Sequence, residues 1–168
     1  MQVAHVPAAS VPVAICCKSG PPLQHPYAVA VGPDGSLYIP NVCQVLKQSA
    51  TSGRVSVFVG ARSGKCADGS HVRDGTPAST TRIGSTMAVA VDQTSGDVYF
   101  AETWIGRVRK VDAKTGLVTT VAGSGQGGSL TGRLGDWGPA TQAELYGISG
   151  LALSQDGHKL YISGRALQ

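Results

Sequence analysis

One pattern of apolar segments and turns occurs twice in full in this chain and begins a third time. Each occurrence opens with an apolar run, followed by a Gly/Asp turn and a short segment containing tyrosine; the opening runs are 28–31, 88–91 and 151–153. Val29 and Val89 are 60 residues apart, and Val89 and Leu151 are 62 apart. A steady period of this length indicates a repeat architecture, whose units bury their apolar faces by stacking on their neighbours.

Each complete copy contains four short apolar segments separated by turns, which is the spacing of antiparallel strands. In the second copy we expect strands at 87–91, 98–101, 107–111 and 117–122, and in the first copy at 27–31, 37–39, 44–47 and 55–59. The opening strand is apolar on both faces and suits an innermost position. The third strand of the second copy is basic, and we expect it nearer the outside or at a face. The pattern predicts a four-stranded antiparallel blade.

A long Gly-rich connection follows the last strand of each copy, at 60–82 and 123–144. The two connections share a motif of aspartate and proline, namely Asp74 and Pro77 in the first and Asp136 and Pro139 in the second. Long loops that recur are usually functional or specially folded. We expect these residues to fix turns, and we place this structural role ahead of a binding role.

Four segments of the second copy carry a family resemblance: VYFAET at 98–103, RVRKV at 107–111, VTTVAG at 118–123 and GDWGPAT at 135–141. In this order they resemble the NHL-repeat family of β-propellers, in its long-repeat form. The resemblance implies an all-β propeller fragment with two complete four-stranded antiparallel blades plus half of a third. Propellers close with roughly four to eight blades, so we expect a piece of a larger propeller or a truncated gene model.

The resemblance divides the chain into four parts: an N-terminal segment at 1–22, a first repeat at 23–82, a second at 83–144 and a truncated third at 145–168. Within the N-terminal segment, 11–15 would be the last strand of a preceding blade. An unclosed stack leaves apolar blade faces and strand edges in water. We therefore expect the isolated chain to self-associate.

Composition supports a folded chain, with 42% hydrophobic residues and only 14% charged residues, against a typical charged share of about 25%. The net charge of +4 is compatible with an anionic partner without requiring one. No run approaches the roughly 18 apolar residues of a membrane helix. The first basic residue is Lys18, which argues against a signal peptide. We expect a soluble chain and leave its compartment open.

The four cysteines include no CxxC pair and no histidine at zinc-finger spacing, so a zinc site has little support. Cys43 and Cys66 lie where the second copy has no cysteine. They would form a disulfide in an oxidising compartment. Four reduced thiols are an equally good interpretation.

The sequence predicts no catalytic residue, no metal and no cofactor. The run 123–128 fits GxGxxG but lacks the helix that a dinucleotide site requires, so we expect a turn-rich loop there. Some propellers are calcium-dependent lactonases or amidating lyases with metal near the central axis. Asn41 and Glu102 would be the nearest ligands here, and two groups do not supply six to eight oxygen atoms.

The candidate ligand-binding residues are Trp104, Arg107, Arg109 and Lys110, which combine an aromatic ring with the one basic cluster on an expected strand. We expect an interaction module, not an enzyme, whose partner is a protein. A metal-dependent hydrolase or lyase is the first alternative. RNA binding through the basic cluster is the second, although such residues on an exposed strand also protect sheet edges.

Overall fold

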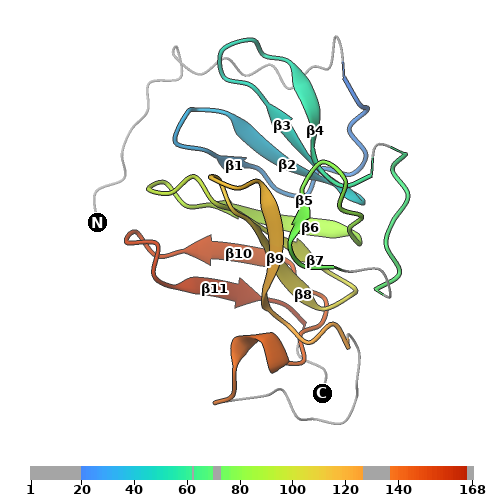
Figure 1. Cartoon of the computed structure of the whole chain (residues 1–168), viewed down its shortest axis with the longest axis vertical. Helices are drawn as coiled ribbons and strands as arrows, with labels where there is room; N and C mark the ends of the chain where they lie inside the picture. The colour runs from blue at the N-terminus through green and yellow to red at the C-terminus, as the bar shows by residue number, and fades with distance from the viewer. Residues whose placement is uncertain (1–19, 62, 70–72, 127–136, 166–168) are drawn as a thin grey trace.

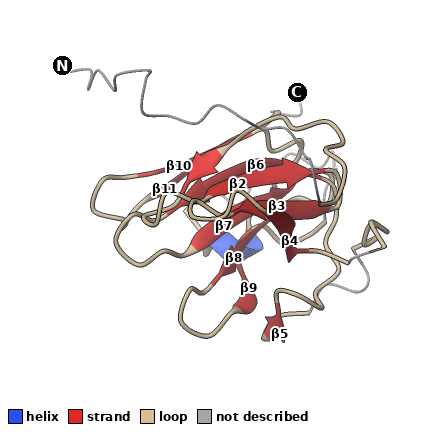
Figure 2. Ribbon diagram, turned by 90° about the horizontal axis from the view of Figure 1, so that it is seen from above, coloured by secondary structure: helices blue, strands red, loops and turns tan. Residues whose placement is uncertain are grey.

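The computed structural model describes residues 20–61, 63–69, 73–126 and 137–165, and the regular secondary structure in this part of the chain is almost entirely β-strand. The strands form three antiparallel sheets that follow one another in chain order (Figures 1 and 2). The expected strand at 11–15 lies outside the described residues. The described residues contain no helix that is both long and apolar enough to cross a membrane.

Blade one contains four strands in chain order, which are β1 (Ala30–Val31), β2 (Leu37–Asn41), β3 (Gln44–Gln48) and β4 (Val55–Val59). Blade two contains β6 (Thr86–Val91), β7 (Val98–Glu102), β8 (Arg107–Val111) and β9 (Leu117–Ala122). The half-blade at the C-terminal end pairs β10 (Gly150–Leu153) with β11 (Leu160–Ser163). The predicted all-β propeller fragment, with two full blades and half of a third, is confirmed.

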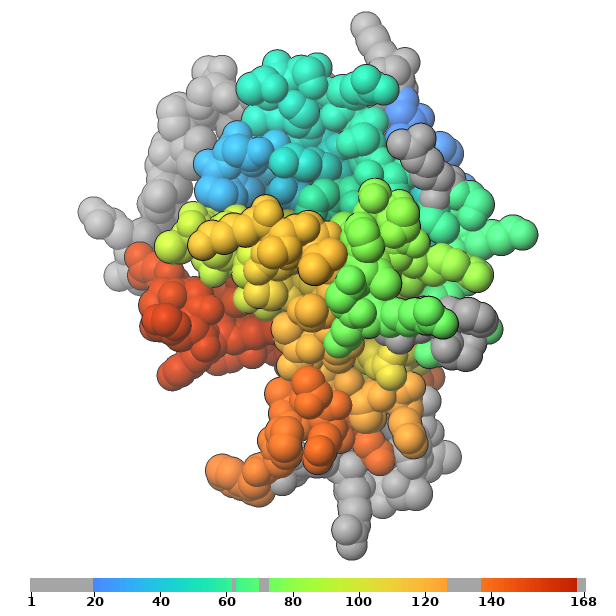
Figure 3. Space-filling view, in the orientation of Figure 1, coloured from blue at the N-terminus to red at the C-terminus, as the bar shows by residue number. Residues whose placement is uncertain are grey.

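Two details differ from the sequence-based expectation. The opening strand of blade one is expected at 27–31, but only Ala30–Val31 pairs with β2. In addition, the sheet of blade two gains a fifth strand, β5 (Thr76–Pro77), which comes from the connection after blade one and pairs with β9. Figure 3 shows this connection, in green, lying against the yellow-orange segment of β9.

Apolar side chains fill the space between successive sheets. Between blades one and two, the buried cluster includes Tyr38 and Val45 from one side and Val89 and Phe100 from the other, with Ile83 also in the cluster. A second cluster lies between blade two and the half-blade and contains Ala88, Ala101, Val108, Ala122 and Ile148. Each blade therefore buries its faces on its neighbours, as the repeat predicts.

Buried hydroxyl groups tie the sheets together where the apolar contacts end. Thr86, at the start of β6, donates its backbone N–H to the carbonyl of Val42 at 2.6 Å and its hydroxyl to the carbonyls of Val42 and Gln44, each at 3.0 Å. Thr103 donates its hydroxyl to the carbonyl of Ile148 at 2.9 Å. Each link joins a residue of blade two to a segment of the neighbouring repeat.

Glycine is required at the end of the fourth strand in both blades. Gly60 and Gly123 have positive φ, at 111° and 88°. A Cβ added at Gly60 would lie 2.9 Å from the Cα of Gln44, and one at Gly123 would lie 2.9 Å from the Cα of Arg107. The chain thus turns sharply against the start of the third strand before it enters the long connection.

Candidate functional site

The candidate site lies at the end of blade two where two loops emerge together. The turn 103–106 joins β7 to β8, and the long connection begins at Gly123 after β9. Because Val108 pairs with Ala122 across the β8–β9 ladder, the turn and the start of the connection share one end of the sheet. This end carries three of the features that the sequence singled out, namely Trp104, the start of the basic strand and the Gly-rich run.

Trp104 stands on a well-anchored turn. Its neighbour Thr103 donates its backbone N–H to the carbonyl of Ser85 at 2.8 Å and accepts the N–H of Gly147 at 3.1 Å. The Trp104 side chain is nevertheless 47% exposed and contacts the ring of Tyr146, with ring centroids 5.7 Å apart. Two aromatic rings from different loops therefore meet at the surface of a rigid turn.

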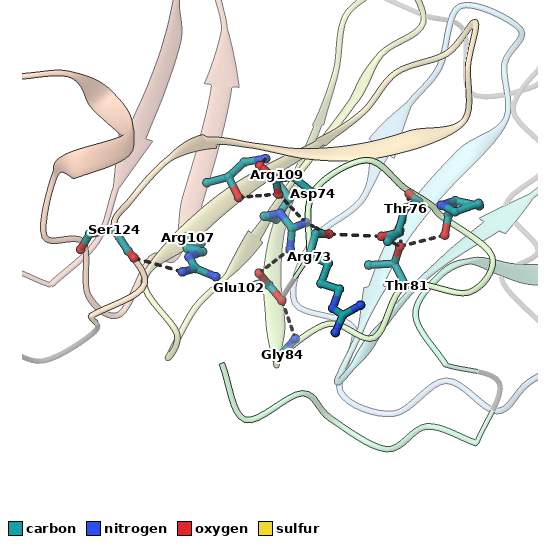
Figure 4. Close-up of polar contacts among 11 residues, drawn as sticks. Arg73, Asp74, Thr76, Thr81, Gly84, Glu102, Arg107, Arg109 and Ser124 are labelled. Atoms are coloured by element: carbon teal, nitrogen blue, oxygen red, sulfur yellow. Dashed lines mark hydrogen bonds and ion pairs between the residues drawn. The ribbon is translucent and has the colours of Figure 1, made fainter. Parts of the chain in front are cut away.

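Arg107 begins β8 and extends toward the start of the connection. Its guanidinium donates to the carbonyl of Ser124 at 3.1 Å (Figure 4). Gly125 has a φ of 78° and packs against this guanidinium, so a side chain at this position would have to displace the end of Arg107. Arg107 is half-buried, and it forms no ion pair with an acidic side chain among the described residues, in contrast to Arg109.

Arg109, two residues further on, is completely buried, so the expectation of an exposed basic strand is wrong at this position. Its guanidinium donates to the Glu102 carboxylate at 3.2 Å, to the Asp74 carboxylate at 3.0 Å and to the carbonyl of Arg73 at 3.1 Å (Figure 4). Glu102 is also fully buried, and it accepts the N–H of Gly84 at 2.7 Å. These contacts hold the Arg109 side chain in the interior of the blade.

The same two positions in blade one are occupied by an uncharged pair. Asn41 corresponds to Glu102 at the end of the second strand, and Leu46 corresponds to Arg109 on the third. The Asn41 side-chain oxygen accepts the N–H of Gln24, which is 60 residues before Gly84. In both blades, therefore, a side chain at the end of the second strand accepts a backbone N–H from the segment that precedes the first strand. Only blade two adds a buried cation beside that acceptor.

Lys110 lies apart from the other basic residues. Its ammonium group is 2.9 Å from the Asp97 carboxylate and 3.7 Å from the Asp112 carboxylate. The hydrogen bond to Asp97 raises the pKa of Lys110 above its ordinary value. The four residues singled out in the sequence therefore separate into Trp104 and Arg107 at one end of blade two, a buried Arg109, and a Lys110 that is already paired.

Asp74 of the loop motif helps to form a small hollow beside Arg107. Its carboxylate accepts the backbone N–H of Thr120 at 3.0 Å and the Thr120 hydroxyl at 2.9 Å. The open hollow has a volume of about 280 Å³. Six residues line it, namely Asp74, Arg107, Thr120, Gly123, Ser124 and Thr141. The contribution of the loop motif to this hollow is not apparent from the sequence, because it depends on the pairing of β5 with β9.

The second loop motif shares a turn with the first, since the carbonyls of Pro77 and Pro139 accept the N–H groups of Thr80 and Gln142, but its surroundings differ over its described part. Pro139 precedes the short 3-10 helix η2 (Ala140–Gln142), whose Ala140 carbonyl accepts the N–H of Gly123 at 2.8 Å. In the first motif Pro77 belongs to β5. Asp136 lies outside the described residues. The two motifs share sequence, but their prolines have different surroundings.

The cysteines and the candidate metal ligands were the two remaining sets of residues that the sequence singled out. Cys43 and Cys66 are joined by a disulfide, which links the β2–β3 turn to the connection after blade one. Asn41 and Glu102, the nearest metal-ligand candidates, belong to separate blades and are engaged in the hydrogen bonds described above. No cluster of three or more His, Cys, Asp or Glu side chains suited to a metal occurs in the described part of the chain.

Comparison with protein-family models finds no match, and comparison with curated proteins finds none either. Solved structures do resemble this fold. A protein of unknown function from Bacteroides thetaiotaomicron matches with a TM-score of 0.60 at 21% identity, over 78% of this chain and 30% of that one. An auxiliary nutrient binding protein from the same organism matches with a TM-score of 0.53 at 17% identity, over 80% of this chain and 33% of that one.

Hydrazine synthase from Kuenenia stuttgartiensis matches with a TM-score of 0.51 at 18% identity, over 88% of this chain and 31% of that one. The chain thus spans about a third of each similar structure. At these identities the likeness shows the propeller-like fold alone. The functions given in the names of these proteins differ widely, as is common for a fold that carries many kinds of site.

Proposed function

We propose that this chain is part of an NHL-type β-propeller interaction module that binds a protein segment at the end of blade two. The observation that carries the proposal is the 47% exposure of Trp104 on an anchored turn, in contact with Tyr146. Tryptophan and arginine are enriched among the residues that dominate protein interfaces. Trp104 and Arg107 provide both types at one end of one blade.

The rigidity of the turn supports the proposal. Thr103 is fastened to Ser85, Gly147 and Ile148 by hydrogen bonds of 2.8–3.1 Å. The backbone that carries the indole is therefore held in place before a partner arrives. A pre-positioned aromatic anchor reduces the entropy cost of association.

The chemistry of the hollow indicates what the partner segment would carry. Small-molecule pockets are mostly apolar and occupy roughly 300–1,000 Å³, whereas this hollow is open, polar and about 280 Å³. Arg107 would donate hydrogen bonds to an acidic side chain of the partner. The Trp104–Tyr146 pair would pack against an apolar side chain next to that acidic residue. A protein segment with an acidic residue beside an apolar or aromatic residue fits this arrangement.

A random-sequence peptide library displayed on phage, selected against the immobilised chain, tests the proposal. Selected peptides should combine an acidic and an apolar residue, and their affinity should fall at least about tenfold for Trp104→Ala. Arg107→Ala should weaken acidic peptides more than versions with the acid replaced by its amide. Trp137→Ala is the matched control, because Trp137 is also exposed but does not line the hollow.

Two results would overturn the proposal. One is selected peptides that bind wild type and Trp104→Ala equally well. The other is peptide binding that single-stranded RNA abolishes in a salt-sensitive way, together with RNA affinity that depends on Arg107. The second result would favour the nucleic-acid alternative, because phosphate contacts produce strong salt dependence.

A further inference from the structure

The connection after blade one carries exposed basic side chains that the site at Trp104 does not use. Lys65, Arg73 and Arg82 are all exposed, and none of them forms an ion pair with an acidic side chain among the described residues. In contrast, the ammonium group of Lys110 contacts two carboxylates. We call the three exposed residues of the connection the basic group.

Hydrogen bonds within the connection hold the basic group together. The Arg82 guanidinium donates to the carbonyl of Cys66 at 3.2 Å, next to the lysine of the group. The hydroxyl oxygens of Thr76 and Thr81 lie 2.7 Å apart, and the Thr76 hydroxyl donates to the carbonyl of Arg73 at 3.2 Å (Figure 4). Because Thr81 directly precedes Arg82, these bonds join the three basic residues through one compact stretch of chain.

The connection is fastened to both blades. The Cys43–Cys66 disulfide links it to the β2–β3 turn of blade one. Further along, β5 pairs with β9, and the Asp74 carboxylate contacts the Arg109 guanidinium at 3.0 Å. The basic side chains therefore belong to a stretch of chain that is anchored on both sides before a ligand binds. Such anchoring reduces the entropy cost of association.

The excess of positive charge is local to this connection. Its two acidic residues are Asp68 and Asp74, and the carboxylate of Asp74 is paired with the buried Arg109. The described part of the second connection, at 123–126 and 137–144, contains no lysine and no arginine. The basic group is thus an addition to one connection and is not part of the repeat.

The composition of the connection indicates which kind of polyanion fits it. Proteins that hold single-stranded nucleic acids combine basic side chains with aromatic rings on which the bases stack. The connection at 60–82 contains no phenylalanine, tyrosine or tryptophan. Its disulfide is a bond that persists in oxidising environments such as the cell exterior. Polysaccharides with sulfate or carboxylate groups occur in that environment and present no bases to stack.

We infer that the basic group binds an anionic polysaccharide, with its three cations contacting sulfate or carboxylate groups along the polymer. The attraction is between exposed charges, so dissolved salt weakens it by screening. The inference goes beyond the peptide site proposed at Trp104 and uses none of the residues of that site. Failure of the peptide site therefore leaves this inference standing, and the reverse also holds.

Binding of the full chain to immobilised dextran sulfate and to immobilised polygalacturonate, measured by biolayer interferometry, tests the inference. Uncharged dextran is the control surface. We expect binding to at least one of the anionic polymers, with an affinity that falls as the salt concentration rises, and no binding to dextran. Binding to dextran sulfate alone identifies sulfate as the recognised group, and binding to polygalacturonate alone identifies the carboxylate. Binding to neither polymer overturns the inference.

A triple variant removes the basic group. Lys65→Ala, Arg73→Ala and Arg82→Ala together should lower the affinity at least about tenfold, because contacts between cations and a polyanion release bound counterions and these contacts are lost. Arg73→Ala alone should lower it at least about twofold for the same reason. The double variant Arg73→Lys with Arg82→Lys keeps the charges and should bind like wild type. Circular dichroism spectra that match wild type would show that the variants fold.

A second triple variant with the same net charge separates a local site from general attraction. Arg54→Ala, Lys114→Ala and Lys159→Ala change exposed residues in hairpin turns at the opposite end of the sheets. Together they should lower the affinity by no more than about threefold, the effect of net charge alone. Equal losses in the two triple variants overturn the inference. Tighter binding to polyuridylate RNA than to either polysaccharide at the same salt concentration also overturns it.

Discussion

The guanidinium of Arg109 lies 3.0 Å from the carboxylate of Asp74, although the two residues are 35 positions apart in the sequence. Asp74 belongs to the connection that leaves blade one, and Arg109 belongs to the third strand of blade two. Because Arg109 also contacts the buried Glu102 at 3.2 Å, one side chain joins the exit of a blade to the interior of the next. The basic strand therefore contributes more to the fold than to the surface.

Arg109→Ala should strongly destabilise the protein. The change leaves the fully buried Glu102 carboxylate without its cation, and such losses cost about 3–5 kcal/mol. Urea unfolding, followed by circular dichroism, measures the effect. Arg107→Ala is the control and should reduce the free energy of unfolding by no more than about 1 kcal/mol. Equal losses for the two variants would contradict the structural role of Arg109.

Thr86→Val should weaken the attachment of blade two to blade one. The variant keeps the volume but removes the hydroxyl that donates to the carbonyls of Val42 and Gln44. We expect a loss of about 1–2 kcal/mol in the free energy of unfolding, with faster hydrogen exchange in β6. Thr94→Val, in an exposed turn, should have little effect on either quantity. Unchanged exchange in β6 would argue against this link.

Reduction of the Cys43–Cys66 disulfide should destabilise the chain by about 3 kcal/mol, the loop-closure value for a sequence separation of 23. Urea unfolding with and without reductant measures this difference. The double variant Cys43→Ala with Cys66→Ala should unfold at the same urea concentration in both conditions. If reductant lowers the stability of the double variant as much as that of wild type, the effect comes from elsewhere.

Acidification should destabilise the protein through its hairpin turns. The N–H of Ser36 lowers the pKa of Asp34 below its ordinary value of 3.8, and the N–H of Thr94 does the same for Asp92. A carboxyl whose pKa is lower in the folded state contributes stability above its unfolded value. This contribution is lost as the pH falls through the lowered folded-state pKa.

Urea unfolding at a series of acidic pH values tests this expectation. The free energy of unfolding should fall as the pH drops below about 4. The double variant Asp34→Asn with Asp92→Asn should show a shallower fall, because the amide oxygen can still accept the backbone N–H of Ser36 or Thr94 while the side chain no longer titrates. An identical acid dependence in wild type and variant would assign the effect to other carboxyl groups.

The repeat predicted most of the strands because their apolar pattern is local. The second copy is expected to contain a strand at 107–111, and β8 spans Arg107–Val111. The shortened β1 was not predictable from its own residues, since 28–31 and 88–91 have the same sequence. What differs is the presence of a preceding sheet, which covers Val89 and is missing from the described surroundings of Val29.

The burial of Arg109 and the strand β5 escaped prediction because both depend on contacts far apart in the sequence. Alternation along a strand predicts that Arg107 and Arg109 share a face. The regular β7–β8 ladder confirms this alternation, but only Arg109 is covered, by Arg73 and Asp74 of the connection after blade one. The acidic partners of Arg109 lie on β7 and in the connection after blade one. The recurrence of aspartate in both loop motifs was the one available signal, and it did not reveal which strand the aspartate would contact.

The equivalence of the Asn41–Leu46 pair with the Glu102–Arg109 pair means that this architecture has two solutions for the same pair of sites. One solution is neutral, while the other is ionic and fastens an adjoining loop through Asp74. Because the two blades fold alike around either pair, these positions form a transplantable unit. Protein engineers who build propellers from such repeats would then choose, blade by blade, between a self-contained sheet and one that is electrostatically locked to the loop before it.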